Sequence, residues 1–431
     1  MGKSTILSNM IHEDIQMGRG VCVIDPHGDL ADDALASVPK HRVKDVVLFD
    51  PSDRDNPVAL NMFDNEDPNK KPLIASGIVA VLKKLNADSW GPRLEYILRN
   101  TTLALLDFPG STFLGILRMY TDEYFRNRVV KEIQDPVVKR FWIEEFGKLE
   151  QKQILEQVGS IQNKVGQFLS NSIIRNILGQ TKSSIDIRKI MDEGKILIVN
   201  LSKGKIGEDN ATLLGSMLIT KIQLDVMGRA DMKEEDRKDF YLYVDEFQNF
   251  ATDSFGTILS EARKYKLNLT MANQYVAQMP DSVRDAVFGN IGSMVTFQVG
   301  VDDTPLFVRQ YGEQVTETDL MEIGKFKYYT RMLINGMPSN PFSVDALPPP
   351  RDEVDHNTII EAIRYSRDNY TKKSSEVEEE IDSWEKKYED PKKGEKEKKL
   401  ADKKSAYEAK KAQLIKEGKW DPAGFNKKKN G

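Results

Sequence analysis

The chain has 431 residues and a mass of 49.0 kDa, a length that predicts two or three structural units. With 39% hydrophobic and 30% charged residues, no apolar run of about 18 residues and no secretory signal, we expect a globular, cytoplasmic protein without a transmembrane helix in these residues. The single cysteine, Cys22, excludes internal disulfides and cysteine-rich zinc sites, and the net charge of −5 argues against a uniformly basic nucleic-acid coat but not against a local basic channel.

The first feature in chain order is a short run that an amphipathic helical pattern follows: Gly2, Lys3, Ser4 and Thr5. A phosphate-binding loop needs a lysine that reaches the terminal phosphates, a hydroxyl that ligates magnesium and backbone N–H groups at a helix start. The run matches the second half of G-x-x-x-x-G-K-[ST], so its four residues are candidate nucleotide-binding residues and Ser4 is a candidate magnesium ligand. Such a run alone is a weak motif, but its place before a helix and an apolar strand strengthens it.

Six short apolar runs rich in β-branched residues alternate with helical patterns: 21–24, 46–49, 195–199, 240–244, 267–271 and 293–297. Continuous apolar strands separated by helices are typical of a parallel sheet that is covered on both faces. These runs therefore predict an α/β core with a mainly parallel sheet.

Residues 66–190 have helical spacing and few β-branched runs, which predicts an all-helical insertion between two strands of the core. Four aromatic residues are expected to form its hydrophobic centre: Trp90, Tyr96, Phe141 and Trp142. The less favoured interpretation is that these rings face DNA.

The strand predicted at 240–244 ends in Asp245 and Glu246. An acidic residue at the end of an apolar strand can hold magnesium, and a neighbouring carboxylate can orient or deprotonate the attacking water. We therefore expect Asp245 to be a metal ligand and Glu246 to be the catalytic base. The competing interpretation is an ordinary strand end that carries two acids, and the Gly-Lys-Ser-Thr run favours the nucleotide site.

Three further residues are candidates because ligands bind at the carboxyl ends of parallel strands. Gln274 follows the strand predicted at 267–271, where it can sense the terminal phosphate or position water. Arg263 precedes that strand and is either an arginine finger that acts across a subunit boundary or a surface salt-bridge partner. Asp25 ends the strand at 21–25, where it either supports the nucleotide site or begins the turn.

Two features lie near the C-terminus. A hairpin is predicted, with strands at 328–334 and 341–344 and the turn pair Asn335-Gly336 after the first strand. The chain from Thr371 onward is rich in lysine and glutamate and poor in core-forming residues, which predicts a solvated helix or a disordered tail. The alternative is an electrostatic arm for nucleic acid or a partner protein, with residues 426–429 as its most basic end.

The motifs together resemble the TraG/TraD-type coupling ATPases of type IV secretion and conjugation, within the HerA/FtsK group of motor ATPases. The resemblance covers roughly residues 1–350 and depends on five runs: Gly-Lys-Ser-Thr at 2–5, Val-Ile-Asp-Pro-His-Gly-Asp at 23–29, Tyr-Val-Asp-Glu-Phe-Gln-Asn-Phe at 243–250, Ala-Arg-Lys-Tyr at 262–265 and Ala-Asn-Gln at 272–274. Its most specific parts are the Asp-Glu-Phe-Gln-Asn-Phe run and the order of the motifs.

The resemblance implies a RecA-like P-loop NTPase core with an all-alpha insertion domain and a charged helical or disordered tail. The implied divisions are residues 1–65 and 191–350 for the two parts of the core, 66–190 for the insertion and 351–431 for the tail. The first strand and the first half of the phosphate loop are expected ahead of Gly2. Membrane helices upstream, where they exist, would place the protein at the cytoplasmic face of the inner membrane.

The resemblance also implies ATP and Mg²⁺ as cofactors and a homohexameric ring that hydrolyses ATP at subunit interfaces and moves DNA through its pore. Carried onto this chain, Lys3 and Ser4 bind phosphate and magnesium and Asp245 completes the metal site. Glu246 then activates water, Gln274 is the sensor and Arg263 the finger from a neighbouring subunit. Type IV secretion or relaxase-type proteins are the implied partners.

Positive charge for DNA is expected in the loop with Lys203 and Lys205, or near Lys164, Arg175 and Lys182; the competing interpretation of the first is a plain exposed loop. Two alternatives stay open: a related secretion ATPase that powers pilus assembly or protein export, and a degenerate fragment that does not hydrolyse ATP.

Overall fold

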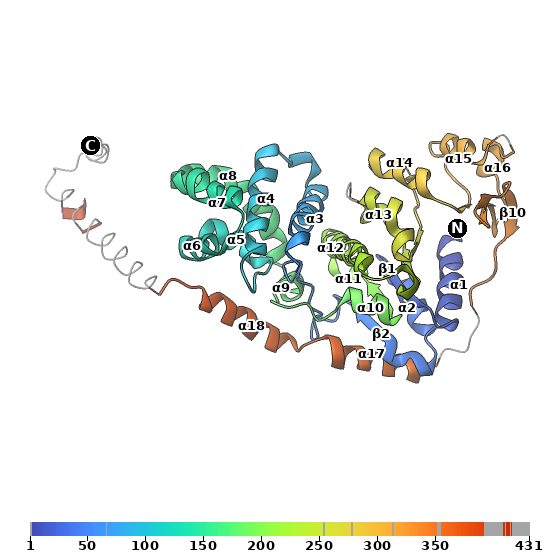
Figure 1. Cartoon of the computed structure of the whole chain (residues 1–431), viewed down its shortest axis with the longest axis horizontal. Coiled ribbons are helices and arrows are strands. Elements are labelled where there is room, and N and C mark those ends of the chain that lie inside the picture. The colour runs from blue at the N-terminus through green and yellow to red at the C-terminus, as the bar shows by residue number, and fades with distance from the viewer. Residues whose placement is uncertain are drawn as a thin grey trace.

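The computed structural model describes residues 2–65, 67–252, 255–276, 279–312, 314–350 and 355–391, and a few helical residues between 408 and 415. Figure 1 shows the sheet and its covering helices in the middle, a group of helices on one side, a small lobe on the other and two C-terminal helices running beneath. Short 3₁₀-helical segments join the larger elements: η1 Lys40–Asp45, η2 Pro68–Lys70, η3 Ala87–Ser89, η5 Phe146–Lys148, η6 Arg229–Asp231, η7 Glu234–Asp236, η8 Phe247–Asn249 and η9 Ala262–Tyr265.

The core is a five-stranded parallel sheet with the order β2-β3-β1-β4-β5. Its strands are β1 Gly20–Asp25, β2 Val46–Phe49, β3 Ile196–Asn200, β4 Phe240–Val244 and β5 Leu267–Met271. The α/β prediction is confirmed, and five of the six apolar runs form this sheet. In the register, Cys22 of β1 lies between Leu197 of β3 and Leu242 of β4.

Alternate residues of β1, β2, β3 and β4 enter two separate hydrophobic layers, because successive side chains of a strand point to opposite faces. Val21 and Val23 belong to the layer under α1 Lys3–Gln16 and α2 Asp29–Ala36. Cys22 and Ile24 belong to the larger layer on the opposite face. That face packs against α12 Glu208–Gly228, α13 Phe255–Glu261 and α14 Asp281–Asn290.

Helices alone fill the described part of the chain between η2 and β3: α3 Lys71–Lys84, α4 Pro92–Leu106, α5 Leu114–Thr121, α6 Glu123–Glu132, α7 Pro136–Arg140, the π-helical turn η4 Phe141–Glu145, α8 Gln151–Leu169, α9 Ser172–Leu178 and α10 Ile187–Glu193. We call this set the helical region. Phe141 and Trp142 are buried at its centre, whereas Trp90 is half-buried and Tyr96 is 40% exposed at the margin. The apolar side chains of the helical region and of the larger sheet face form one continuous cluster.

The sixth apolar run does not join the parallel sheet, so that expectation was wrong. Residues of 293–297 form β6 Met294–Thr296 in a three-stranded antiparallel sheet with β7 Lys327–Arg331 and β10 Phe342–Asp345, beside α15 Thr304–Tyr311 and α16 Glu317–Met321. Met294 and Thr296 are buried but Val295 is exposed, so β6 covers a core on one side only. A central parallel strand needs both faces covered.

The predicted hairpin is confirmed, with one added break. β7 pairs with β10, and between them β8 Leu333–Ile334 pairs with β9 Met337–Pro338 around Asn335 and Gly336. Both turn residues have positive φ, 52° and 81°, as an Asn-Gly hairpin turn requires.

The C-terminal tail packs against the body at its start, which corrects the expectation of a solvated helix from Thr371 onward. α17 His356–Tyr370 covers the edge strand β2, where Leu48 N donates to Ser366 Oγ at 2.7 Å. α18 Ser374–Lys387 then runs under the helical region (Figure 1) and buries Val377, Ile381 and Trp384. These three lie on one helical face, a spacing that marks a buried stripe. Residues 426–429 lie outside the described residues.

Within the part of the chain that the structure describes, we find no helix long and apolar enough to cross a membrane.

The tail helices offer a matched test of this packing, because α18 buries one isoleucine and α17 exposes another. Ile381 is 5% exposed and Ile360 is 63% exposed. We expect Ile381→Ala to lower the free energy of unfolding by about 2–4 kcal/mol through the cavity it leaves. Ile360→Ala is expected to change it by less than about 0.5 kcal/mol. Urea unfolding of both variants measures the difference, and equal effects would contradict the docking of α18.

Candidate functional site

The candidate site begins at the N-terminus of α1. Gly2 is the residue before the helix and has a φ of 125°, a conformation that side chains rarely adopt. A Cβ atom at Gly2 would also lie 2.4 Å from the ring of Phe297, so glycine is required at this position. The N-cap residue Gly2 offers no side-chain cap to α1, and the first turn of the helix holds no acidic residue. The first N–H groups of an α-helix have no intrahelical acceptors, so without that cap those of α1 are available to attract anions.

The run at the start of α1 and the acidic run after β4 meet in space. Lys3 Nζ donates to Glu246 Oε1 at 2.7 Å, although the two residues are 243 positions apart. Glu246 has a φ of 45°, which is uncommon for a residue other than glycine, and only 8% of it is exposed. This left-handed residue, two positions beyond the end of β4, has its side chain directed at Lys3 of α1. The two sequence motifs thus form one cluster.

The charges of this cluster shift the pKa values of its two carboxyl groups in opposite directions. Burial disfavours ionisation of Glu246, but hydrogen bonds from Lys3 and Gln248 outweigh it and leave its pKa below the usual value. Burial is the largest cause that raises the pKa of Asp245; Lys3 opposes the rise and the neighbouring Glu246 adds to it. Asp245 is therefore a buried acid whose ionised form a cation would stabilise.

Asp25 is fully buried at the end of β1, where it organises the following turn. Its carboxylate accepts three backbone N–H groups, from His27 and Gly28 at 2.8 Å and from Ala31 at 3.0 Å. These bonds shape the entry into α2. The predicted contribution of Asp25 to nucleotide binding stays a prediction.

The hydroxyl-bearing candidates lie on the first turn of α1, with Ser4 exposed and Thr5 half-buried. Gln274 is exposed three residues beyond β5, on the carboxyl side of the sheet, as Asp245 and Glu246 are. Arg263 is exposed in η9, before β5 begins. Since a strand rises about 3.3 Å per residue, β5 separates Arg263 from the carboxyl edge of its own chain by roughly 16 Å. Its predicted role therefore requires a neighbouring copy.

Of the lysines considered for DNA, Lys205 is exposed and Lys203 half-buried on the short helix α11 Lys203–Ile206, which follows β3. Lys164 is buried, and its ammonium group bonds Asn86 and Ser89. The structure therefore removes Lys164 from the DNA-facing candidates.

Sequence reasoning missed three residues that support the cluster. Gln248 Nε2 donates to Glu246 Oε2 at 2.6 Å, and Lys84 contacts the backbone of the same loop. Gln248 lies inside the quoted acidic motif and two residues after Glu246, a position that could have marked it. Tyr243 is the third: its hydroxyl donates to Asp14 Oδ2 at 2.5 Å and so ties β4 to α1.

The residues present fit a magnesium ion that is held jointly by protein oxygens and nucleotide phosphates. Among the described residues, no group of three or more histidine, cysteine, aspartate or glutamate side chains could hold a metal by itself. Magnesium in nucleotide sites typically uses one or two protein oxygens together with phosphates and water. Asp245 and Ser4 would supply such oxygens.

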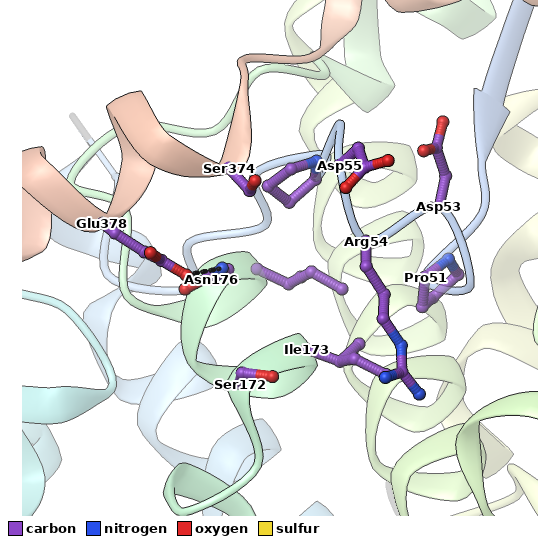
Figure 2. A pocket seen from close by; sticks show the side chains of 11 residues that line it. Pro51, Asp53, Arg54, Asp55, Ser172, Ile173, Asn176, Ser374 and Glu378 are labelled. Carbon is purple, nitrogen blue, oxygen red and sulfur yellow. Dashed lines mark hydrogen bonds between the residues drawn. The ribbon is translucent and has the colours of Figure 1, made fainter.

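A separate cavity of about 200 Å³ lies away from this cluster, where the tail meets the body. Figure 2 shows that the loop with Arg54, the helix with Asn176 and the start of α18 at Ser374 surround it. None of the predicted site residues lines it, so we assign it to the junction of α18 with the body.

Comparisons with known proteins agree with this picture at the level of the fold. The chain is similar to unbound bacterial conjugative coupling protein TrwBdeltaN70, with a TM-score of 0.56 and 12% identity over 82% of this chain and 84% of that one. It is also similar to plasmid coupling protein TrwB in complex with ADP and Mg²⁺, with a TM-score of 0.57 and 14% identity over 83% and 85% of the two chains. The same protein with a non-hydrolysable ATP analogue gives 0.55 and 14% over 82% and 85%.

At these identities the similarity shows the fold, and it confirms the resemblance to coupling ATPases at that level. No protein-family model matches the sequence, and no curated protein matches it.

The Tyr243–Asp14 bond tests how α1 is held against β4. Tyr243→Phe leaves the buried carboxylate of Asp14 without one donor, so we expect unfolding to become easier by about 1–3 kcal/mol. Tyr241→Phe is the matched control, because its half-buried ring keeps its place 5.0 Å from the Arg19 guanidinium. Chemical denaturation of both variants is the measurement. A loss for Tyr243→Phe no larger than that of the control would contradict the role of this bond.

Proposed function

We propose that this chain is an ATP-hydrolysing motor that moves DNA or a nucleoprotein. The observation that carries the proposal is the contact of Lys3 with Glu246, beside Asp245, at the junction of α1 and β4. It places a lysine at a helix N-terminus next to two carboxylates at a strand end, which is the arrangement that phosphoryl transfer uses. The fold of TrwB, whose structures include complexes with ADP and Mg²⁺, supports the nucleotide.

Each residue then has a distinct role. Lys3 and the N–H groups of α1 bind the phosphate oxygens, and Lys3 leaves Glu246 to do so. The freed Glu246 carboxylate accepts a proton from the attacking water. Ser4 and Asp245 would hold Mg²⁺, which when bound would supply positive charge opposite the phosphate oxygens. Gln274 would sense the terminal phosphate from the same edge of the sheet.

The proposal includes a ring of six copies. Arg263 lies at the amino ends of the parallel strands, whereas Glu246 lies at their carboxyl ends. Only a neighbouring chain can therefore bring this guanidinium to the phosphates. An arginine at that place stabilises charge in the transition state. The subunit boundary is thus where hydrolysis would occur.

DNA is the proposed polymer because the similar solved proteins are conjugative or plasmid coupling proteins. In this chain, Lys205 is exposed on α11 at the end of β3, on the same side of the sheet as Glu246. A basic residue there can bind DNA phosphates. Type IV secretion or relaxase-type proteins would be its partners.

ATP hydrolysis by the full-length protein, with and without DNA, tests the proposal. We expect DNA-stimulated turnover that Glu246→Gln lowers by about 10²- to 10⁴-fold, the range for loss of a general base. Glu376→Gln, at an exposed residue of α18, is the matched control and should keep wild-type turnover. Turnover that Glu246→Gln leaves intact would contradict the site, whereas turnover that DNA does not change would favour the secretion ATPases that drive pilus assembly or protein export.

The proposed phosphate contact of Lys205 has its own test. If Lys205 binds a phosphate, Lys205→Ala should weaken DNA binding and reduce the slope of log affinity against log salt by about 0.9 for duplex DNA. Lys233→Ala, at an exposed lysine between η6 and η7, is the control. Binding measured at several salt concentrations gives the slopes. An unchanged slope for Lys205→Ala would place DNA elsewhere on the protein.

A further inference from the structure

Lys84 connects the helical region with the loop that follows β4. It is the last residue of α3, and its Nζ donates to Gln248 O at 2.8 Å and to Ala251 O at 2.6 Å. These two carbonyls belong to the loop that carries Glu246. One ammonium group of the helical region therefore holds the backbone next to the candidate catalytic carboxylate.

The same loop is held from its other side by α12. The ring of Phe250 lies so close to α12 that a Cβ atom at Gly215 would be 2.3 Å from it. Ser216 Oγ donates to Phe250 O at 3.3 Å, and Phe247 is fully buried. The loop thus has one apolar anchor on α12 and one polar anchor on α3. A close-packed apolar anchor fixes the position of the loop, while the polar anchor can be removed without opening a cavity.

Gln248 transmits the position of the loop to the carboxylate. Its Nε2 holds Glu246 Oε2 at 2.6 Å, while Lys3 holds Oε1 at 2.7 Å. Gln248 Oε1 is buried and has no hydrogen-bond partner among the described residues. An unsatisfied buried acceptor is rare in folded proteins and calls for a function. Here it lies on the side chain that holds the candidate base.

We propose that Lys84 and Gln248 are positioning residues for Glu246, so that the helical region controls the rate of hydrolysis through the loop after β4. The inference rests on the proposed ATPase function of this site. When Lys3 leaves Glu246 for the phosphates, Gln248 remains as the donor that holds the carboxylate. Lys84 keeps the loop, and with it the Gln248 side chain, in place.

This arrangement predicts an effect on turnover without an effect on nucleotide affinity. Lys84 and Gln248 contact the loop and the base, whereas the phosphate oxygens are assigned to Lys3 and the N–H groups of α1. A misplaced base slows the chemical step, because displacement by about 1 Å can cost roughly 10²-fold in rate. Binding of the nucleotide does not require the base.

The experiment compares Lys84→Met and Gln248→Ala in the full-length protein. We expect each to lower kcat by about tenfold or more while the Kd for adenylyl imidodiphosphate stays within about twofold of wild type. Lys84→Arg should recover most of kcat, because a guanidinium can also donate to two carbonyls. Lys83→Met is the matched control: the adjacent lysine of α3 lies 3.5 Å from Glu95 and away from the loop.

The double variant shows whether Lys84 and Gln248 act through the same carboxylate or lower kcat independently of each other. If both residues act on Glu246, Lys84→Met with Gln248→Ala should lose little more kcat than the worse single variant. Thermal unfolding of every variant is recorded in parallel. Gln248→Ala leaves α3 untouched, so it tests the inference even if Lys84→Met does not fold.

The outcomes are distinct. Three results would overturn the positioning role and leave the ATPase function standing, provided that the wild-type protein hydrolyses ATP. These are a kcat of Gln248→Ala equal to that of wild type, a Kd that rises as kcat falls, and losses of kcat that multiply in the double variant. No turnover by the wild-type protein would overturn the proposed function and this inference with it. A fall in kcat alone, rescued by Lys84→Arg and absent in Lys83→Met, supports it.

Discussion

The candidate site of this protein depends on one ion pair, Lys3 with Glu246, because it joins the start of the first helix to the loop that follows β4. Such a pair is weak evidence for stability, since removing two charges from water costs about as much as their attraction returns. Its geometry is instead supplied by the scaffold: β4 lies next to β1 in register, and Tyr243 of β4 bonds Asp14 of α1. The pair is therefore a consequence of the packing around it, and either member can change partner without disturbing the fold.

Much of the scaffold could be predicted because its physical causes are local. Five apolar runs became parallel strands, since only a sheet covered on both faces hides such runs from water. The run at 293–297 has similar composition but exposes Val295, and composition cannot show which face a neighbour will cover. The prediction of a solvated tail was wrong for a related reason. The three apolar residues on one face of α18 are too few to predict burial from composition, yet Trp384 alone packs against Phe125 and Tyr388.

The candidate site divides in the same way. Lys3, Asp245 and Glu246 could be proposed from sequence because their motifs are contiguous runs. One run has glycine, lysine and hydroxyl residues at a helix start, and the other has two acids at a strand end. Lys84 could not, because a lysine at the end of a helix has many ordinary explanations and its partners are backbone carbonyls far along the chain. The left-handed φ of Glu246 also has no sequence signal, since glutamate rarely adopts it.

The relation between the helical region and the sheet explains why contacts such as that of Lys84 matter. The two share one apolar cluster, with α3 and α12 so close that a Cβ atom at Gly77 would be 2.4 Å from the side chain of Thr220. A packed core of this kind resists gradual deformation and changes, if at all, between discrete arrangements. The polar contacts at its border have no such constraint, because a lysine released from a carbonyl finds water. If Lys84 positions the loop as proposed, a small displacement of α3 would alter the loop after β4 before it altered the core.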